Sequence, residues 1–389
     1  MAWLRETLAV TWLNLRNLPS RLWPSLVIVA GMGAAIGVLV SILSLAEGYV
    51  QMERRTGDPE RAIILSESAD TEGMSAISRS SIGDIIAAPG VARDVDGSSL
   101  ADADYISYFQ ASRGPSSIVI LATLRGIGRK GLAVRPELKI VSGRMFRAGA
   151  RELIIGIASQ SEFRGLEVGD KVIMQDGEWP IVGSFTTGGD VLEGQLIGDA
   201  DTLMSAARKN SFKSVIVRLA GPDSLATLQR ALAARPALAV RAERQSDYYE
   251  RTSGDTITFF RAVAYAVGGI MALGALFGAL NTLYSAVGAR TQEIGTLRAL
   301  GFGGTAVAFS VIAESLLLAL AGALIGIGIA WALFHGQRYA FGENLFNLTV
   351  SVKLVGLGVA WAMVVALLGG ILPAIRAARL PVVEALRAV

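Results

Sequence analysis

The chain has 389 residues, of which 52% are hydrophobic and only 18% are charged, with one histidine and no cysteine. Soluble domains carry about 25% charged residues, so this composition predicts an integral membrane protein. The net charge is only +3 and the basic residues flank apolar runs, so the pI of 9.2 does not indicate nucleic acid as a partner. Without cysteine, the single His335 cannot build a zinc site, and a Ser-His-Asp triad would depend on it alone.

Residues 1–23 are the first predicted element, an amphipathic helix lying in the membrane interface, with Leu4, Leu8, Leu15 and Leu18 on one side. The apolar run that follows extends beyond the 7–15 residues of a secretory signal peptide. We therefore expect an uncleaved transmembrane span, with cleavage as the alternative.

Four apolar runs are long enough to cross a hydrocarbon core of about 30 Å as helices. They are Pro24–Ala46, Ala262–Gly288, Thr305–Phe334 and Leu354–Ile375. The expected fold class is therefore a membrane α-helical bundle of four transmembrane helices. A large α+β extracytoplasmic domain is inserted between spans 1 and 2.

Residues 47–261 have the pattern of this mixed domain. Short β-like runs occur at Ala62–Leu65, Ser117–Leu124, Glu152–Ile157, Lys171–Met174, Pro180–Phe185 and Ser214–Leu219. Helices are expected near Ser80–Ala87, Ala200–Arg208 and Asp223–Ala234.

The segments that join this domain to spans 1 and 2 are charged but compatible with helix. If residues 244–288 form one helix, it would be roughly 65 Å long at 1.5 Å per residue. That is about twice the hydrocarbon thickness, so the helix would leave the membrane as a stalk. Gly254 could kink or interrupt it, and a flexible linker is the alternative.

The loop 289–304, between spans 2 and 3, is short and patterned. Residues 289–302 read ARTQEIGTLRALGF, in which Ile294, Leu297 and Leu300 recur at i, i+3 and i+6 and give a helix one apolar side. The polar and charged groups of this helix are Arg290, Gln292, Glu293 and Arg298. Gly301 is a helix stop. The pattern predicts a helix that docks into a groove on a cytoplasmic partner.

Small residues recur within the spans at helix-packing spacing, as the pairs Gly33/Gly37, Gly274/Gly278 and Gly322/Gly326. Such pairs allow close helix approach either within one chain or between two, and the sequence leaves both open. Glu314 is a carboxylate within span 3, where a charge costs roughly 3 kcal/mol. A packing or conformational role in the bundle is our interpretation, with a proton or substrate role as the alternative.

Arginine placement orients the spans, because short cytoplasmic loops carry an excess of Lys and Arg. One side of the bundle has Arg338 and Lys353 in the short loop 335–353. The other side consists of segment 1–23, loop 289–304 and tail 376–389, and carries Arg5, Arg16, Arg21, Arg290, Arg298, Arg376, Arg379 and Arg387. We therefore expect both termini and the patterned loop in the cytoplasm, and residues 47–261 outside.

Three parts of the sequence resemble the MacB/FtsX-like permease family of ABC transporters. The loop 290–301 is similar to the family's coupling helix, and Ile312–Leu318 followed by Gly322 and Gly326 resembles the opening of its third span. The tail 373–386 is similar to its C-terminal signature. More loosely, residues 142–185 resemble its external domain, and the order of elements is the family's too.

The resemblance implies a multi-pass protein of the bacterial inner membrane, with its large domain in the periplasm. It implies no cofactor in this chain, because ATP and Mg²⁺ would be bound by a separate cytoplasmic ABC ATPase subunit. No Gly-x-x-x-x-Gly-Lys-Ser/Thr loop occurs here. The other implied partners are a second or related permease copy in a dimer, membrane lipids and a periplasmic adaptor protein.

The resemblance also implies roles for the loop residues in ATPase coupling. Arg290, Glu293 and Arg298 would be polar docking contacts, assisted by Gln292. Ile294 and Leu297 would be apolar anchors, while Gly295 and Gly301 would allow close approach and termination.

Two classes of function follow. The first is a permease subunit that couples ATP hydrolysis to motion of its periplasmic domain, for export of amphipathic or lipidic cargo. The second is an FtsX-like signalling transducer that activates a periplasmic hydrolase or sensor without moving cargo. We expect no enzyme activity in this chain, and no catalytic, metal-binding or cofactor-binding residue.

Overall fold

The computed structural model describes residues 22–113, 118–174, 176–341 and 344–381. The chain divides into two compact units. The helical unit comprises the chain up to Glu47, Thr258–Gln337 and the chain from Leu348, and the mixed unit comprises Gly48–Ile257 and Arg338–Asn347. The predicted interfacial helix over residues 1–23 lies almost entirely outside the described residues, as does the end of the C-terminal tail.

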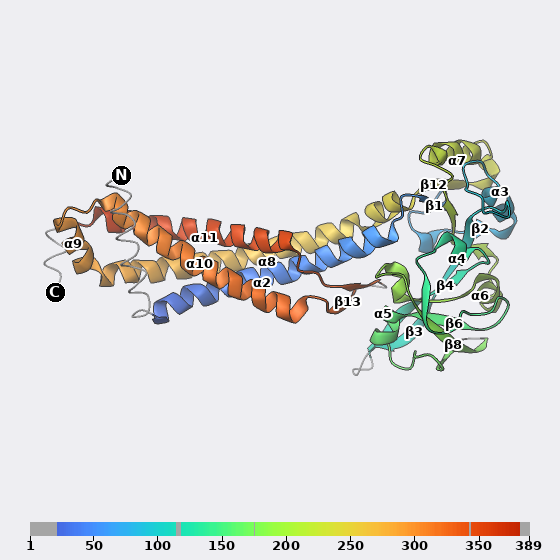
Figure 1. Ribbon diagram of the computed structural model, residues 1–389, viewed down its shortest axis with the longest axis horizontal. Helices are drawn as coiled ribbons and strands as arrows, with labels where there is room; N and C mark the ends of the chain where they lie inside the picture. The colour runs from blue at the N-terminus through green and yellow to red at the C-terminus, as the bar shows by residue number, and fades with distance from the viewer. Residues whose placement is uncertain (1–21, 114–117, 175, 342–343, 382–389) are drawn as a thin grey trace. The chain divides into compact units, whose positions relative to one another are not determined.

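Four long helices, drawn in Figure 1, contain the four predicted spans. They are α2 (Leu22–Thr56), α8 (Gln245–Ala289), α10 (Gly304–Phe334) and α11 (Val352–Arg379). All four are long and apolar enough to cross a membrane. A short helix, α9 (Thr291–Ala299), lies between α8 and α10 in the chain.

The helical unit has a core of small and branched side chains. Met32 and Ile36 of α2 lie in one buried cluster with Ala323 of α10, Ala362 of α11 and Ala272 of α8. Lipid supplies no hydrophobic drive between helices, so packing in a membrane depends on close contact between such residues. The four spans therefore form one bundle.

The two segments that join the bundle helices to the mixed unit are helical. α2 is continuous from Leu22 to Thr56, and α8 passes through Gly254 without a break. The 45 residues of α8 correspond to about 68 Å of helix. The stalk prediction is therefore correct as to secondary structure, and the flexible-linker alternative is wrong.

A ten-stranded mixed sheet forms the centre of the second unit, in the order β12-β1-β11-β3-β4-β9-β6-β8-β5, with β7 paired to β8. Its strands are β1 (Arg61–Ser66), β3 (Ala101–Arg113), β4 (Ile118–Ile127), β5 (Lys139–Gly143), β6 (Leu153–Gly156), β7 (Lys171–Met174), β8 (Gly177–Thr186), β9 (Gln195–Asp199), β11 (Ser214–Arg218) and β12 (Val240–Arg244). The pairs β4–β9 and β6–β8 are parallel and the others antiparallel. A two-stranded sheet pairs β2 (Ile77–Ser78) with β10 (Ser211–Phe212).

Short helices cover the sheet. They are α3 (Ile82–Ile86), α4 (Gly131–Val134), α5 (Ile157–Glu162), α6 (Ala200–Ala206) and α7 (Ser224–Ala233), with the 3-10 turns η2 (Glu72–Met74), η3 (Arg79–Ser81), η4 (Val191–Gly194) and η5 (Pro236–Leu238). One core cluster joins β1 and β11 to α3 and α7. It includes Ile64 of β1, Val217 of β11, Ile85 of α3 and Leu228 of α7. A second cluster surrounds Trp179 on the other half of the sheet. The α+β fold is thus confirmed.

The segment between α10 and α11, predicted only as a loop over 335–353, contains a hairpin. Its strands are β13 (Arg338–Phe341) and β14 (Asn344–Asn347). Leu345 belongs to the same buried cluster as Trp179, and Arg338 donates a hydrogen bond to the carbonyl of Ile157, 3.0 Å away. The loop therefore contributes to the mixed unit.

Candidate functional site

The predicted loop helix forms as α9 and ends where the sequence indicates. Gly301 has φ +98°, in the left-handed region that favours glycine. Its amide donates to the carbonyl of Arg298, and the amide of Phe302 donates to the carbonyl of Leu297. Gly301 thus closes α9 and lets the chain turn back into α10.

The inner side of α9 packs on the bundle. Ile294 is buried in a cluster with Val287 of α8, Val307 of α10 and Ala377 of α11, and Gly295 is buried as well. Ile294 is therefore an internal contact, which differs from its expected role as an anchor on a partner. Leu297 is half-buried.

An ion pair lies directly behind α9. Arg290 donates to the two carboxylate oxygens of Glu314, at 2.9 and 3.1 Å. The two side chains are only 6% and 9% exposed. The pair joins the start of α9 to α10 inside an apolar bundle, which supports the interpretation of Glu314 as a packing residue. The expected role of Arg290 as a docking contact is not compatible with this burial.

Arg298 makes a second polar link behind α9. Its guanidinium donates to the carbonyl of Leu380, at the end of α11. Two segments that resemble family signatures, the loop and the start of the tail, are therefore in direct contact. Arg298 is half-buried, so it serves this internal contact.

The outer face of α9 is polar, with one large apolar residue. Gln292, Glu293 and Thr296 are exposed, and Leu300, just beyond the helix, is 73% exposed. Of the predicted contact residues, Gln292 and Glu293 are therefore exposed, and Leu297 and Arg298 are half-buried.

Two of the three glycine pairs pack on each other within the chain. A Cβ atom on Gly326 would lie 2.1 Å from the carbonyl oxygen of Gly33, and one on Gly37 would lie 3.2 Å from the carbonyl oxygen of Gly326. Gly322 makes a similar approach to Val29. The crossing of α2 and α10 thus depends on these glycines. Gly274 and Gly278 of α8 have open space at the Cβ position.

His335 has a structural environment. Its ring stacks on Trp331 with centroids 5.5 Å apart, and its Nδ1 accepts a hydrogen bond from the amide of Val350 at 3.3 Å. It therefore fixes the segment that follows α10.

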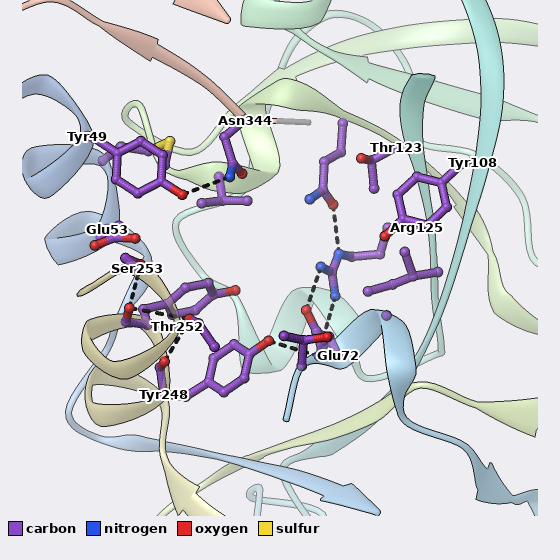
Figure 2. A pocket seen from close by; sticks show the side chains of 17 residues that line it. Tyr49, Glu53, Glu72, Tyr108, Thr123, Arg125, Tyr248, Thr252, Ser253 and Asn344 are labelled. Carbon is purple, nitrogen blue, oxygen red and sulfur yellow. Dashed lines mark hydrogen bonds and ion pairs between the residues drawn. The ribbon is translucent and has the colours of Figure 1, made fainter. Parts of the chain in front are cut away.

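Sequence reasoning missed a polar cavity in the mixed unit, lined in part by Glu53 and Arg125 (Figure 2). A single arginine in the apolar stretch 122–127 was the available signal, because a charge inside a buried strand requires a partner.

The fold is that of a membrane protein with four long apolar helices and a large mixed domain inserted between the first two. Two family models match the chain: the MacB-like periplasmic core domain over residues 25–235 and the FtsX-like permease C-terminal model over residues 265–382. The chain therefore belongs to the MacB/FtsX-like family of ABC transporter permeases.

Curated relatives share limited parts of the sequence. The macrolide export ATP-binding/permease protein MacB of Nitrobacter winogradskyi is 25% identical over 193 residues, which is 46% of this chain and 28% of that protein. The uncharacterized ABC transporter permease YknZ of Bacillus subtilis is 28% identical over 134 residues, 34% of this chain and 33% of that protein. The chain thus spans a third or less of the length of these relatives.

Solved structures that match part of this chain include the extracellular domain of YknZ from Gram-positive bacteria. The match covers 47% of this chain and 99% of the solved structure, at 16% identity and a TM-score of 0.36. Another is the periplasmic region of MacB from Actinobacillus actinomycetemcomitans. This match covers 52% of this chain and 96% of the solved structure, at 16% identity and a TM-score of 0.38.

Proposed function

We propose that this permease subunit couples ATP hydrolysis by a separate cytoplasmic ATPase to motion of its external domain, and that this motion drives export of amphipathic or lipidic cargo. The observation that carries the proposal is the construction of α9. Its outer face is polar and accessible, whereas its inner side is held to α10 by Ile294 and the Arg290–Glu314 pair. A packed helix of this kind passes a displacement to its neighbours.

In this proposal the protein lies in the bacterial inner membrane with both termini in the cytoplasm. The excess of arginine around α9 and beside the two termini supports this orientation. The outer face of α9 is then available to an ATPase that holds ATP and Mg²⁺. The apolar core of the bundle favours handling of cargo outside it, where a periplasmic adaptor protein would assist.

A second permease copy would complete the transporter. The face of α8 that carries Gly274 also exposes Ile270, Leu273 and Phe277, and we assign it to this contact. Since the chain has no cysteine, Gly274→Cys provides a test. It should form a disulfide-linked dimer in membranes, while Gly328→Cys, on an equally open position of α10, should not. Equal crosslinking of both variants would contradict this assignment.

The coupling proposal is tested by copurifying the chain with its neighbouring ATP-binding subunit and measuring ATPase turnover in lipid. The outer-face variant Gln292→Ala/Glu293→Ala should keep its fold but lose assembly. The inner-face variant Glu314→Gln should assemble and fail to support coupled turnover. Glu178→Ala, which removes an exposed carboxylate from the external domain, is the matched control. If the outer-face variant keeps both assembly and turnover, α9 is not the coupling element.

Transport and signalling are separated by a second readout. An exporter should show ATPase turnover that responds to an amphipathic substrate in proteoliposomes. A transducer should activate a periplasmic hydrolase or sensor with turnover unaffected by such substrates. The second result would replace export by signalling and leave the coupling role of α9 in place.

A further inference from the structure

A polar cavity of about 240 Å³ lies in the mixed unit (Figure 2). Its walls come from the ends of α2 and α8, from η2 and from strands β3, β4, β9 and β14. Figure 2 shows Tyr49 and Glu53 on one side and Arg125 with Glu72 on the other. No step of the coupling proposal uses this cavity.

The positive charge in the wall is already balanced. The Arg125 guanidinium donates to Glu72 at 2.9 and 3.0 Å, to Asp104 at 2.6 Å and to Gln195 at 2.8 Å. Burial alone would raise the pKa of Glu72, but the charge and hydrogen bonds of Arg125, with a bond from Ser214, hold that pKa below its ordinary value. Arg125 and Glu72 therefore form a closed pair, and neither needs a ligand.

Glu53 is the unbalanced group. It is 7% exposed and lines the cavity. Its backbone carbonyl accepts a hydrogen bond from the amide of Gly57, but among the residues that the structure describes its carboxylate has neither a hydrogen bond nor an ion pair, and burial is the only influence on its pKa. Nearby, the hydroxyl of Tyr49 accepts a hydrogen bond from Asn344 at 3.0 Å. An ionised carboxylate that is buried without a partner is costly, and burial accordingly raises the pKa of Glu53 to about 8. The carboxylate is therefore stabilised either by taking up a proton or by pairing with a cation that enters the cavity.

The remaining polar groups of the wall favour a donor as ligand. The hydroxyl of Thr252 donates to the carbonyl of Tyr248 at 2.8 Å, and that of Ser253 donates to the carbonyl of Tyr249. Their protons are thus engaged, and the oxygen lone pairs remain for an incoming N–H group.

Aromatic rings surround the acceptors. Tyr49, Tyr108, Tyr248 and Tyr249 all line the cavity, and aromatic faces attract ammonium groups. A divalent metal ion would instead need several oxygen ligands, usually including carboxylates. In the part of the chain that the structure describes, no group of three or more His, Asp or Glu residues could hold a metal ion.

We propose that this cavity binds a protonated alkylamine, whose ammonium group pairs with Glu53 and donates to the hydroxyl oxygens of Thr252 and Ser253, with the tyrosine rings around its alkyl chain. The volume is below the roughly 300 Å³ of drug-sized ligand sites, so it suits a small amine or the amine end of a longer molecule. The site lies within one subunit, and its occupation does not depend on an ATPase.

The test is binding of n-butylammonium to the purified full chain in lipid nanodiscs, measured by calorimetry. Butanol is the neutral control, and sodium replaces butylammonium at equal ionic strength. Glu53→Gln removes the charge at constant shape and should weaken binding by about tenfold or more, as expected for a hydrogen bond to a charged group. Glu250→Gln is the matched control, because Glu250 lies on α8, is exposed and is outside the cavity wall. It should bind like the wild type.

Three results would overturn the proposal: no binding to the wild type, equal binding to Glu53→Gln, or equal binding of butanol or sodium. An unchanged circular dichroism spectrum relative to the wild type would show that Glu53→Gln is folded, so that any loss of amine binding reports on the missing charge. Competition by a short peptide with a free amino terminus, but not by its acetylated form, would identify the amine end of a longer molecule as a ligand. Without such competition, the site takes free amines. Failure of binding would leave the coupling assay unaffected, because that assay contains no added amine.

Discussion

The buried pair behind α9 provides the most direct test of the coupling site. Glu314→Leu removes the carboxylate and leaves the Arg290 guanidinium in the bundle with its charge, since arginine is not deprotonated in proteins. The Nε atom of Arg290 already has no hydrogen-bond partner among the described residues, so no spare acceptor is at hand. Breaking a buried pair by removing one partner costs about 3–5 kcal/mol. We expect a loss of about 3 kcal/mol or more in the free energy of unfolding.

The double variant Arg290→Met/Glu314→Leu removes both charges and fills the space with apolar groups. Replacing a buried pair in this way is often neutral or stabilising, so the double variant should be within about 1 kcal/mol of the wild type. The single variant Arg290→Met should also be destabilising, because it leaves the Glu314 carboxylate buried without its partner.

The assay is denaturant unfolding of the full chain in mixed micelles, followed by circular dichroism and extrapolated linearly. Glu293→Leu, which removes an exposed carboxylate from α9, is the matched control and should change stability by about 1 kcal/mol or less. If Glu314→Leu costs no more than this control, or if the two single effects add in the double variant, the pair does not hold α9 to α10.

Two further predictions concern the bundle crossing and the external domain. Gly326→Ala should lose on the order of 2 kcal/mol in the same unfolding assay, because its Cβ would lie 2.1 Å from the Gly33 carbonyl oxygen. Gly328→Ala, which has open space at the Cβ position, should be neutral or stabilising. Equal effects of the two variants would contradict the close crossing of α2 and α10. Burial and the neighbouring Asp104 raise the pKa of Asp102 to about 7, so its stabilising contribution is present below about pH 4 and is lost as the pH rises through about 7. Relative to Asp102→Asn, the wild-type protein should therefore lose protection in β3 between about pH 5 and pH 8, measured by hydrogen exchange in the full chain. A pH-independent difference would refute this cause.

The helices of the bundle could be predicted because a membrane-spanning helix requires only a long apolar run, which is visible in the local sequence. Each predicted span lies inside one long helix. The ends differ most where α2 and α8 continue beyond the apolar run, to Thr56 and from Gln245, and by a few residues where α11 continues to Arg379. Hydropathy detects a span but not the polar helical segment that extends it. The short strands β1, β6 and β7 were predictable for the same reason, as compact apolar runs.

Other strands could not be predicted, because their partners are distant in the chain. β3 contains Asp102 and Asp104, which read as a loop until Arg125 and Arg135 are placed beside them. β12 carries several charges and lies at the edge of the sheet.

The candidate site shows the same limit. The pattern of α9 predicted a helix and its end at Gly301, but not which side faces inwards. In the sequence, Arg290 and Glu293 are both charged residues of the same short loop, and nothing local tells the buried one from the exposed one. Only the position of Glu314, in another helix, makes Arg290 internal. In the same way, the pairing of Gly33 with Gly326 requires knowing which helices are neighbours.

Comparing two buried carboxylates in long helices, Glu314 and Glu53, distinguishes a structural charge from a charge that we propose binds a ligand. Glu314 has its counter-charge inside the chain, so the pair is complete and neutralisation should destabilise the protein. Glu53 is equally buried but has no counter-charge among the described residues. Glu53→Gln should therefore leave stability unchanged or raise it by about 1 kcal/mol in the absence of amine, since an unpaired buried charge is unfavourable, while Glu314→Gln should lower it. Both are measured by unfolding of the full chain in micelles. Losses of similar size for the two variants would mean that Glu53 has a stabilising partner, and the cavity would then need no cation.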